Sequence, residues 1–212
     1  MPFLRPGKRW MPALLLLGAC RSQYKSLQPA PQRDAHCIEK FAPQFSNQLY
    51  STQVDILKHH LSGLLFFKQM PDSSMRLVFA NEMGFKFFDF EFTKSGAFVK
   101  HYVFDKMDKP AVVKTLRKDF ELVLLHPDLS QARVLTGNGL QYTAVPTEKG
   151  NNYFITDTAC NQLVRIEKSS AKKPVVIVKM WHYQQGTPDS ISVHHTRFKF
   201  NITLQKTQRA KD

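Results

Sequence analysis

The sequence predicts a mainly β protein, in which a curved antiparallel sheet or unclosed β-barrel of about ten strands packs on one amphipathic helix. Apolar and polar side chains alternate in 85–92 (FKFFDFEF) and again in 198–205, which is the two-residue period of a half-buried strand. Short polar turns separate these segments and others like them, as in antiparallel hairpins. Only 109–125 shows strong helical spacing over several turns.

The first half of the folded part is expected to be a meander of short strands. The turns between them carry typical turn residues, such as PDSS at 71–74 and KSG at 94–96. A short helix is predicted before the meander, within 37–49, because apolar residues there are spaced by three and four, although Pro43 interrupts it. The expected strands are 50–57, 61–70, 75–80, 85–92 and 97–104.

The predicted helix runs from about Lys109 to Leu125, with Asp108 as its N-cap and Pro110 in its first turn. Its apolar stripe includes Val112, Val113, Leu116 and Phe120, and the polar residues Lys114, Arg117, Lys118, Asp119 and Glu121 are assigned to the other face. Two roles remain open for this helix: it fills the core of the sheet, or it forms a movable lid over a cavity.

More strands are expected after the helix, at 140–147, 152–156, 161–167, 175–183 and in the final stretch, 190–205. We expect one apolar face from each half of the chain to line a cavity beneath the helix. The alternative is that these side chains fill a solid core. The candidate wall residues are Phe88, Phe90, Phe92, Phe198, Phe200, Ile202 and Leu204, and Asp89 and Glu91 are expected on the opposite face.

The N-terminus has the parts of a secretory signal peptide: three cations (Arg5, Lys8 and Arg9), a short apolar run at 11–17, and small residues after it. The run is shorter than the roughly 20 residues that a membrane-spanning helix needs. Leu17-Gly18-Ala19-Cys20 resembles a bacterial lipobox. That resemblance implies cleavage after 1–19 and a mature chain that begins with Cys20, carrying a diacylglycerol and an N-acyl chain.

The segment 20–36 is expected to be the lipidated cysteine followed by a flexible tether, because it is polar and contains Pro29 and Pro31. The remainder, 37–212, is expected to form one folded domain. Arg21 stands where some bacterial lipoproteins carry an Asp that retains them at the inner membrane, so the periplasmic face of the outer membrane is favoured.

The chain is strongly basic. Removing the three cations of the signal segment from a formal net charge of +13 leaves +10. Export argues against nucleic acid as the partner, and an exported basic domain is suited to anionic lipid head groups or other envelope polyanions. The alternative is a solvated surface with no specific partner.

The sequence offers little support for catalysis or metal binding. It has no GxSxG, P-loop or HExxH motif, so we expect no enzyme and no cofactor. His59-His60 and His194-His195 are adjacent pairs, whose members point to opposite faces of a strand, so we expect no metal site. Cys37 and Cys160 form a disulfide in an oxidising compartment, or they are two separate buried residues.

The order of lipobox, tether, meander, one helix and further antiparallel strands resembles the LolA/LolB-like family of lipoprotein carriers and outer-membrane acceptors. The similarity covers about residues 45–206 and is clearest in 61–92 and 191–206 (ISVHHTRFKFNITLQK). The resemblance implies a half-barrel with an apolar cavity for lipid or for the acyl chains of lipoproteins, and the lipid anchor favours the acceptor side. A non-catalytic envelope scaffold that binds a protein or polysaccharide is the alternative function.

Overall fold

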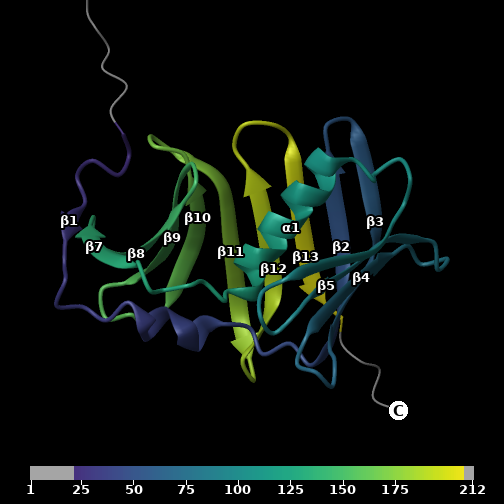
Figure 1. The fold of residues 1–212 in the computed structure, drawn as a ribbon, viewed down its shortest axis with the longest axis horizontal. Coiled ribbons are helices and arrows are strands. Elements are labelled where there is room, and N and C mark those ends of the chain that lie inside the picture. Colours follow the sequence, from purple (N-terminus) through teal and green to yellow (C-terminus); the bar gives the residue numbers. More distant parts are fainter. Residues whose placement is uncertain (1–21, 208–212) are drawn as a thin grey trace, which may run out of the picture.

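A computed structural model describes residues 22–207, which form one antiparallel sheet of 13 strands that is not closed into a barrel. The strand order is β1-β7-β8-β9-β10-β11-β12-β13-β2-β3-β4-β5-β6, so β1 and β6 are the two free edges. The sheet curves around α1, which lies diagonally in front of its central strands (Figure 1). The predicted fold class is confirmed. The signal segment 1–19 and Cys20 lie outside the described residues.

Two meanders are joined through the helix. The strands of the first are β2 (Asn47–Ile56), β3 (His59–Gln69), β4 (Met75–Ala80), β5 (Lys86–Phe92) and β6 (Phe98–Val103). The helix α1 (Pro110–Leu124) follows. The second meander contains β7 (Arg133–Gly137), β8 (Leu140–Thr147), β9 (Gly150–Asp157), β10 (Leu163–Ser169), β11 (Pro174–Gln184), β12 (Thr187–His195) and β13 (Phe200–Lys206). The last strand returns to pair with β2 along seven residues, which unites the two halves in one sheet.

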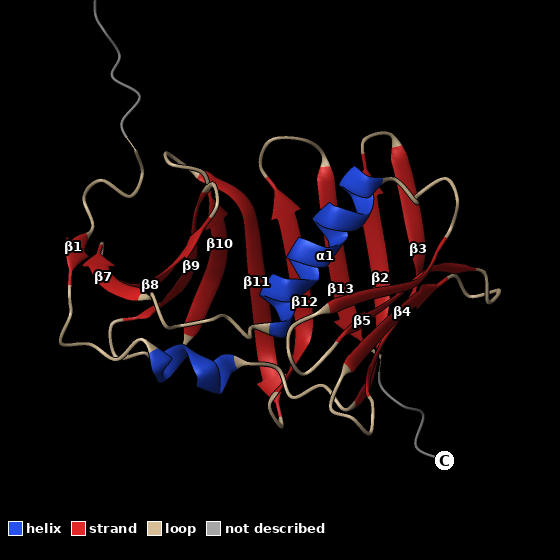
Figure 2. Cartoon of the chain, in the orientation of Figure 1, coloured by secondary structure: helices blue, strands red, loops and turns tan. Residues whose placement is uncertain are grey.

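The interior lies between α1 and the concave face of the sheet (Figure 2). Alternation along β5 points Phe88 and Phe90 to the interior, where their rings stack on each other. The ring of Phe88 also contacts that of Phe79 on the neighbouring strand β4. Phe120 of α1 packs against Phe88 and against Phe67 of β3, with ring centroids 5.7 and 6.4 Å apart. The helix therefore closes over the first meander as part of a continuous core.

Some predicted elements differ in the structure. The helix expected within 37–49 is the single 3₁₀ element η1 (His36–Phe41), because Pro43 follows and the chain is already extended at Ala42. The helix α1 begins with Lys109 as N-cap, which makes no side-chain capping bond. The Asp108 carboxylate instead accepts from Nζ of Lys100 at 2.7 Å, so the expected cap at Asp108 is wrong.

The segment preceding η1 differs most from the prediction. Residues 22–35 are not a free tether but lie along the sheet, where β1 (Gln28–Pro29) pairs with β7. The Tyr24 hydroxyl donates to Glu167 at 2.7 Å, and its ring stacks on Tyr153 with centroids 4.2 Å apart. Burial and the Glu167 bond raise the pKa of Tyr24. A few aromatic and aliphatic contacts thus fix a segment whose composition is polar.

A disulfide ties this N-terminal segment to the sheet. Cys37 of η1 is bonded to Cys160, which lies in the turn between β9 and β10, and their Cα atoms are 6.3 Å apart. Cys160 is buried and has a left-handed backbone (φ 54°). The bond spans 123 residues of sequence, so it joins the start of the domain to the second meander.

Candidate functional site

A large cavity lies beside α1 on the concave side of the sheet, with a volume of about 1770 Å³. Buried apolar side chains line it from β5, the end of α1, and strands β8, β9 and β11. The six side chains of this apolar wall are Phe92, Leu122, Leu124, Val145, Phe154 and Val176. A second hollow of about 940 Å³ lies against the helix and shares four lining residues with the first: Lys114, Lys118, Glu121 and Glu148. The volume of the first cavity exceeds the roughly 300–1,000 Å³ that is typical of small-molecule sites.

Only two of the seven predicted wall residues reach the cavity. Phe92 lines it from the end of β5, and Phe198 lines it from the turn between β12 and β13, where its ring is 45% exposed. The other five are buried in the core: Phe88, Phe90, Phe200, Ile202 and Leu204. Phe88 and Phe90 stack with centroids 4.5 Å apart. The part of the sheet beneath Phe120 is therefore filled with aromatic side chains, and the open space lies to one side of them.

The four predicted lid residues lie at two depths. Leu116 and Phe120 are buried in the core, whereas Val112 and Val113 are half-buried and pack at its edge. The helix side chains that line the large cavity are mostly polar: they include Lys114, Thr115 and Lys118. The apolar stripe therefore anchors α1 to the sheet, and the adjacent polar strip borders the open space.

A buried contact between a carboxyl group and an imidazole, which was not predicted from the sequence, links the helix to the sheet. The Asp119 carboxylate lies 2.8 Å from Nε2 of His195 on β12, and both side chains are buried. Burial raises the pKa of Asp119, and the bond to His195 opposes that rise. The expectation that Asp119 lies on the solvent face is wrong, because positions 116, 119, 120 and 123 have the i, i+3, i+4, i+7 spacing of one helix face. That spacing could have identified it.

Four residues that are direct partners on neighbouring strands form a row across the concave face, and the row ends at His195. Asn152 of β9 is paired with Lys168 of β10, Lys168 with Val176 of β11, and Val176 with His195 of β12. Directly paired residues lie on the same face of a sheet, and all four line the large cavity. Oδ1 of Asn152 and Oδ1 of Asp119 are buried without a hydrogen-bond partner. These residues form part of a largely polar lining, next to the six buried apolar side chains named above.

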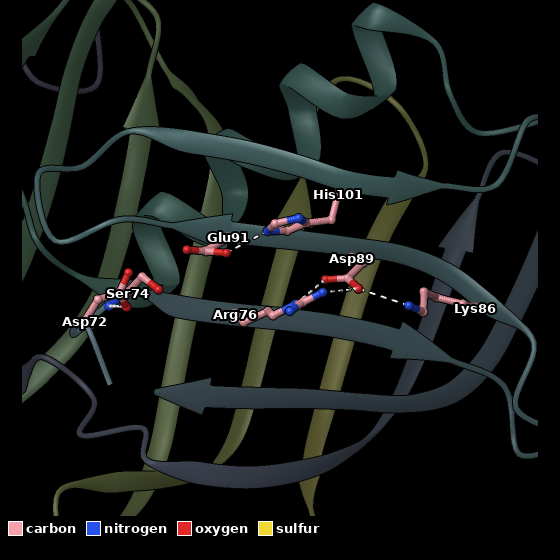
Figure 3. A network of polar contacts seen from close by, with 7 residues as sticks. All are labelled: Asp72, Ser74, Arg76, Lys86, Asp89, Glu91 and His101. Carbon is pink, nitrogen blue, oxygen red and sulfur yellow. Dashed lines mark hydrogen bonds and ion pairs between the residues drawn. The ribbon is translucent and has the colours of Figure 1, made fainter. Parts of the chain in front are cut away.

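A polar network lies on the opposite face of β4–β6 (Figure 3). Arg76 holds both oxygens of Asp89, at 2.8 and 3.0 Å, and Lys86 adds a third contact at 3.0 Å. His101 lies 2.6 Å from Glu91. Burial works to raise the pKa of Asp89, but the bonds from Arg76 and Lys86 outweigh it and leave the pKa below its ordinary value. Asp89 and Glu91 thus lie, as predicted, on the face of β5 opposite Phe88 and Phe90.

The residues of the two histidine pairs contact different partners. His194 and His195 point to opposite faces: His194 contacts Asn201 and is exposed, whereas His195 contacts Asp119 and is buried. His60 contacts the Asp55 carboxylate across the β2–β3 hairpin. Across residues 22–207, no group of three His, Cys, Asp or Glu side chains is placed to hold a metal ion.

Within the described part of the chain, no helix is both long enough and apolar enough to cross a membrane.

Comparison with known proteins supports the fold. No family model and no curated protein matches the sequence. Among solved structures, the chain is similar to a LolA superfamily protein from Nitrosomonas europaea, with 6% identity and a TM-score of 0.50 over 83% of this chain and 92% of that one. A DUF1329 family protein from Desulfovibrio piger aligns with 10% identity and a TM-score of 0.43, over 81% of this chain and 88% of the other. The arrangement of sheet and helix is LolA-like.

Proposed function

We propose that this protein is a membrane-anchored lipoprotein that binds lipid, or the acyl chains of lipoproteins, in the cavity beside α1. The observation that carries the proposal is the cavity itself: about 1770 Å³ of open space between the helix and the sheet, with a buried apolar wall. The LolA-like fold is consistent with this use. Binding and release need no covalent chemistry, so the proposed role is not that of an enzyme.

The anchor is the second part of the proposal. Cleavage before Cys20 and acylation of its sulfur would hold the domain at a membrane, and Arg21 favours the periplasmic face of the outer membrane. In the structure residues 22–35 lie along the sheet, so little chain separates Cys20 from the folded domain. A protein anchored in this way would work close to the bilayer, where it could receive acyl chains.

Native mass spectrometry tests the binding proposal. We expect protein purified from cells under mild conditions to carry bound phospholipid or an acylated peptide. Leu122→Trp replaces an aliphatic side chain of the cavity wall with a bulky ring that occupies part of the cavity, so it should reduce the bound fraction. Trp181→Phe, on the exposed part of β11, is the control. A wild-type protein that carries no lipid and takes up none from added vesicles would favour a scaffold that binds a protein or polysaccharide.

Anchoring is tested separately by labelling cells with a fatty acid analogue. We expect the wild-type chain to be labelled and Cys20→Ser to be unlabelled and unprocessed. Equal labelling of the two would reject Cys20 as the modified residue without bearing on the cavity.

A further inference from the structure

Three lysines converge on the cavity from two elements and are called here the lysine cluster: Lys114 and Lys118 of α1, and Lys168 of β10. Lys114 and Lys118 are four residues apart, which places them on the same side of the helix. Lys168 stands opposite on the sheet, between Asn152 and Val176 in the row across the concave face. Lys118 and Lys168 are half-buried, and Lys114 is exposed.

Among the carboxylates that line the cavity with these lysines are Asp119, Glu121 and Glu148. The two carboxylates near Lys168 are engaged elsewhere, since Asp119 binds His195 and Glu121 lies 2.7 Å from Nε of Arg117. Across residues 22–207, no carboxylate lies within 4.0 Å of a lysine of the cluster. Burial lowers the pKa of Lys168, and the charges of Lys118 and Lys114 add to this effect, while the carboxylates of Asp119 and Glu121 oppose it without reversing it.

Like charges that meet in a partly buried space without counterions are costly unless something else neutralises them. The cavity as a whole is lined by more lysine and arginine side chains than carboxylates. Its apolar wall begins next to the cluster, because Val176 adjoins Lys168 and Phe154 pairs with Ile166, two residues away on the same strand. A positive site therefore sits at the border of an apolar surface.

We propose that the cavity selects amphiphiles with an anionic head, which the lysine cluster binds while the acyl tail lies on Phe154, Val145 and Val176. This inference rests on the proposed function and adds the class of head group. A fatty acid carboxylate and the phosphate of an anionic phospholipid share the required chemistry: a compact negative charge on an apolar tail. The strength of such contacts comes from charge-assisted hydrogen bonds in a partly desolvated place.

Matched probes separate the charge of the head from the length of the tail. The purified full chain, kept in a fluorinated surfactant, is titrated at pH 8 with a pyrene-labelled fatty acid and with its methyl ester. A second arm uses pyrene-labelled phosphatidylglycerol and phosphatidylcholine, which distinguishes a fatty acid from a phospholipid as the source. We expect the anionic member of at least one pair to bind about tenfold or more tightly than its uncharged or zwitterionic partner, a difference of about 1.4 kcal/mol.

Substitutions of lysine test whether the preference for an anionic head comes from the lysine cluster. The triple variant Lys114→Gln, Lys118→Gln, Lys168→Gln should lose this preference and keep the affinity for the methyl ester. The control triple variant, Lys25→Gln, Lys58→Gln, Lys179→Gln, removes the same charge from positions outside the cavity lining and should keep the preference. Thermal melts of both variants establish that each is folded.

The outcomes separate the two proposals. If the wild type binds acid and ester equally, and both phospholipids equally, the head-group inference is overturned and acyl binding stands. The head-group inference is also overturned if the cluster variant keeps the preference. If no probe binds the wild type, the proposed function itself fails.

Discussion

Phe90 is fully buried and is enclosed by aromatic neighbours: it stacks on Phe88, and its ring lies 5.0 Å from that of Phe98. Alternation along the strand is enough to predict which way it points. Alternation does not predict whether the ring faces a cavity or a filled core, because that depends on strands and a helix that are distant in sequence. Phe120 supplies the answer, since it packs on Phe88 from α1.

We therefore expect Phe90→Ala to destabilise the protein by about 3–5 kcal/mol, the usual cost of truncating a buried Phe. Denaturant melts measure it. Phe85→Ala is the control, because Phe85 is 43% exposed and sits at the beginning of the same segment; its loss should be clearly smaller. A small loss for Phe90→Ala would mean that the core beneath α1 is loosely packed.

Asp89 gives a prediction about pH. Its depressed pKa means that the carboxylate stabilises the folded state above the unfolded value of about 3.9 and that this contribution is lost as the pH falls through the folded pKa. Asp89→Asn should cost about 1.5–3 kcal/mol at pH 7, because it removes charge-assisted bonds. The difference from wild type should shrink as the pH is lowered from about 4 towards 2. A difference that is constant over this range would show that charge is not what Asp89 contributes.

Among the elements, α1 is the most predictable and β1 the least. The helix is expected at 109–125 and is found at Pro110–Leu124, because a long amphipathic stripe is a strong signal. The strands β4 and β8 have the expected bounds. By contrast, β1 has two residues and exists only through its pairing with β7, which was also not predicted. Such short edge strands depend on tertiary contacts that no local pattern reports.

The helix should tolerate charge on one side and not on the other. We expect Leu116→Asp to cost several kcal/mol, because it buries a carboxylate without a partner. Lys114→Asp, at an exposed position one half-turn earlier, should change stability by no more than about 0.5 kcal/mol. Thermal melts compare them. Equal melting temperatures would place α1 with a different face against the sheet.

Across the domain, the disulfide links two segments that are distant in the chain. Joining residues 123 apart restricts the unfolded chain, and the chain-entropy model assigns about 4–5 kcal/mol to a loop of this size. Cys160→Ser should therefore lower the melting temperature markedly, and the reduced wild type should melt close to the variant. Wild type that melts identically with and without reductant would contradict a bond in the native protein.

The class of this sheet could be predicted from the sequence, but the arrangement that produces the site could not. Hairpins between neighbouring strands follow from local turns, whereas the pairing of β13 with β2 joins residues about 150 positions apart. The cavity is lined by side chains from α1, β5, β8, β9, β10 and β11, elements that are far apart in the sequence. The wall formed by Val145, Phe154 and Val176 belongs to ordinary buried strands, and nothing in their local sequence separates them from core residues.

Acyl binding in the cavity is tested most directly by mapping where an acyl chain lies. A fatty acid carrying a diazirine near its methyl end is bound to the full chain and photoactivated, and the labelled peptides are identified by mass spectrometry. We expect label in 116–128 and 145–154, which contribute the apolar wall of the cavity. Label confined to the exposed aromatic residues of β11, Trp181 and Tyr183, or label that excess unlabelled fatty acid fails to displace, would contradict acyl binding in this cavity.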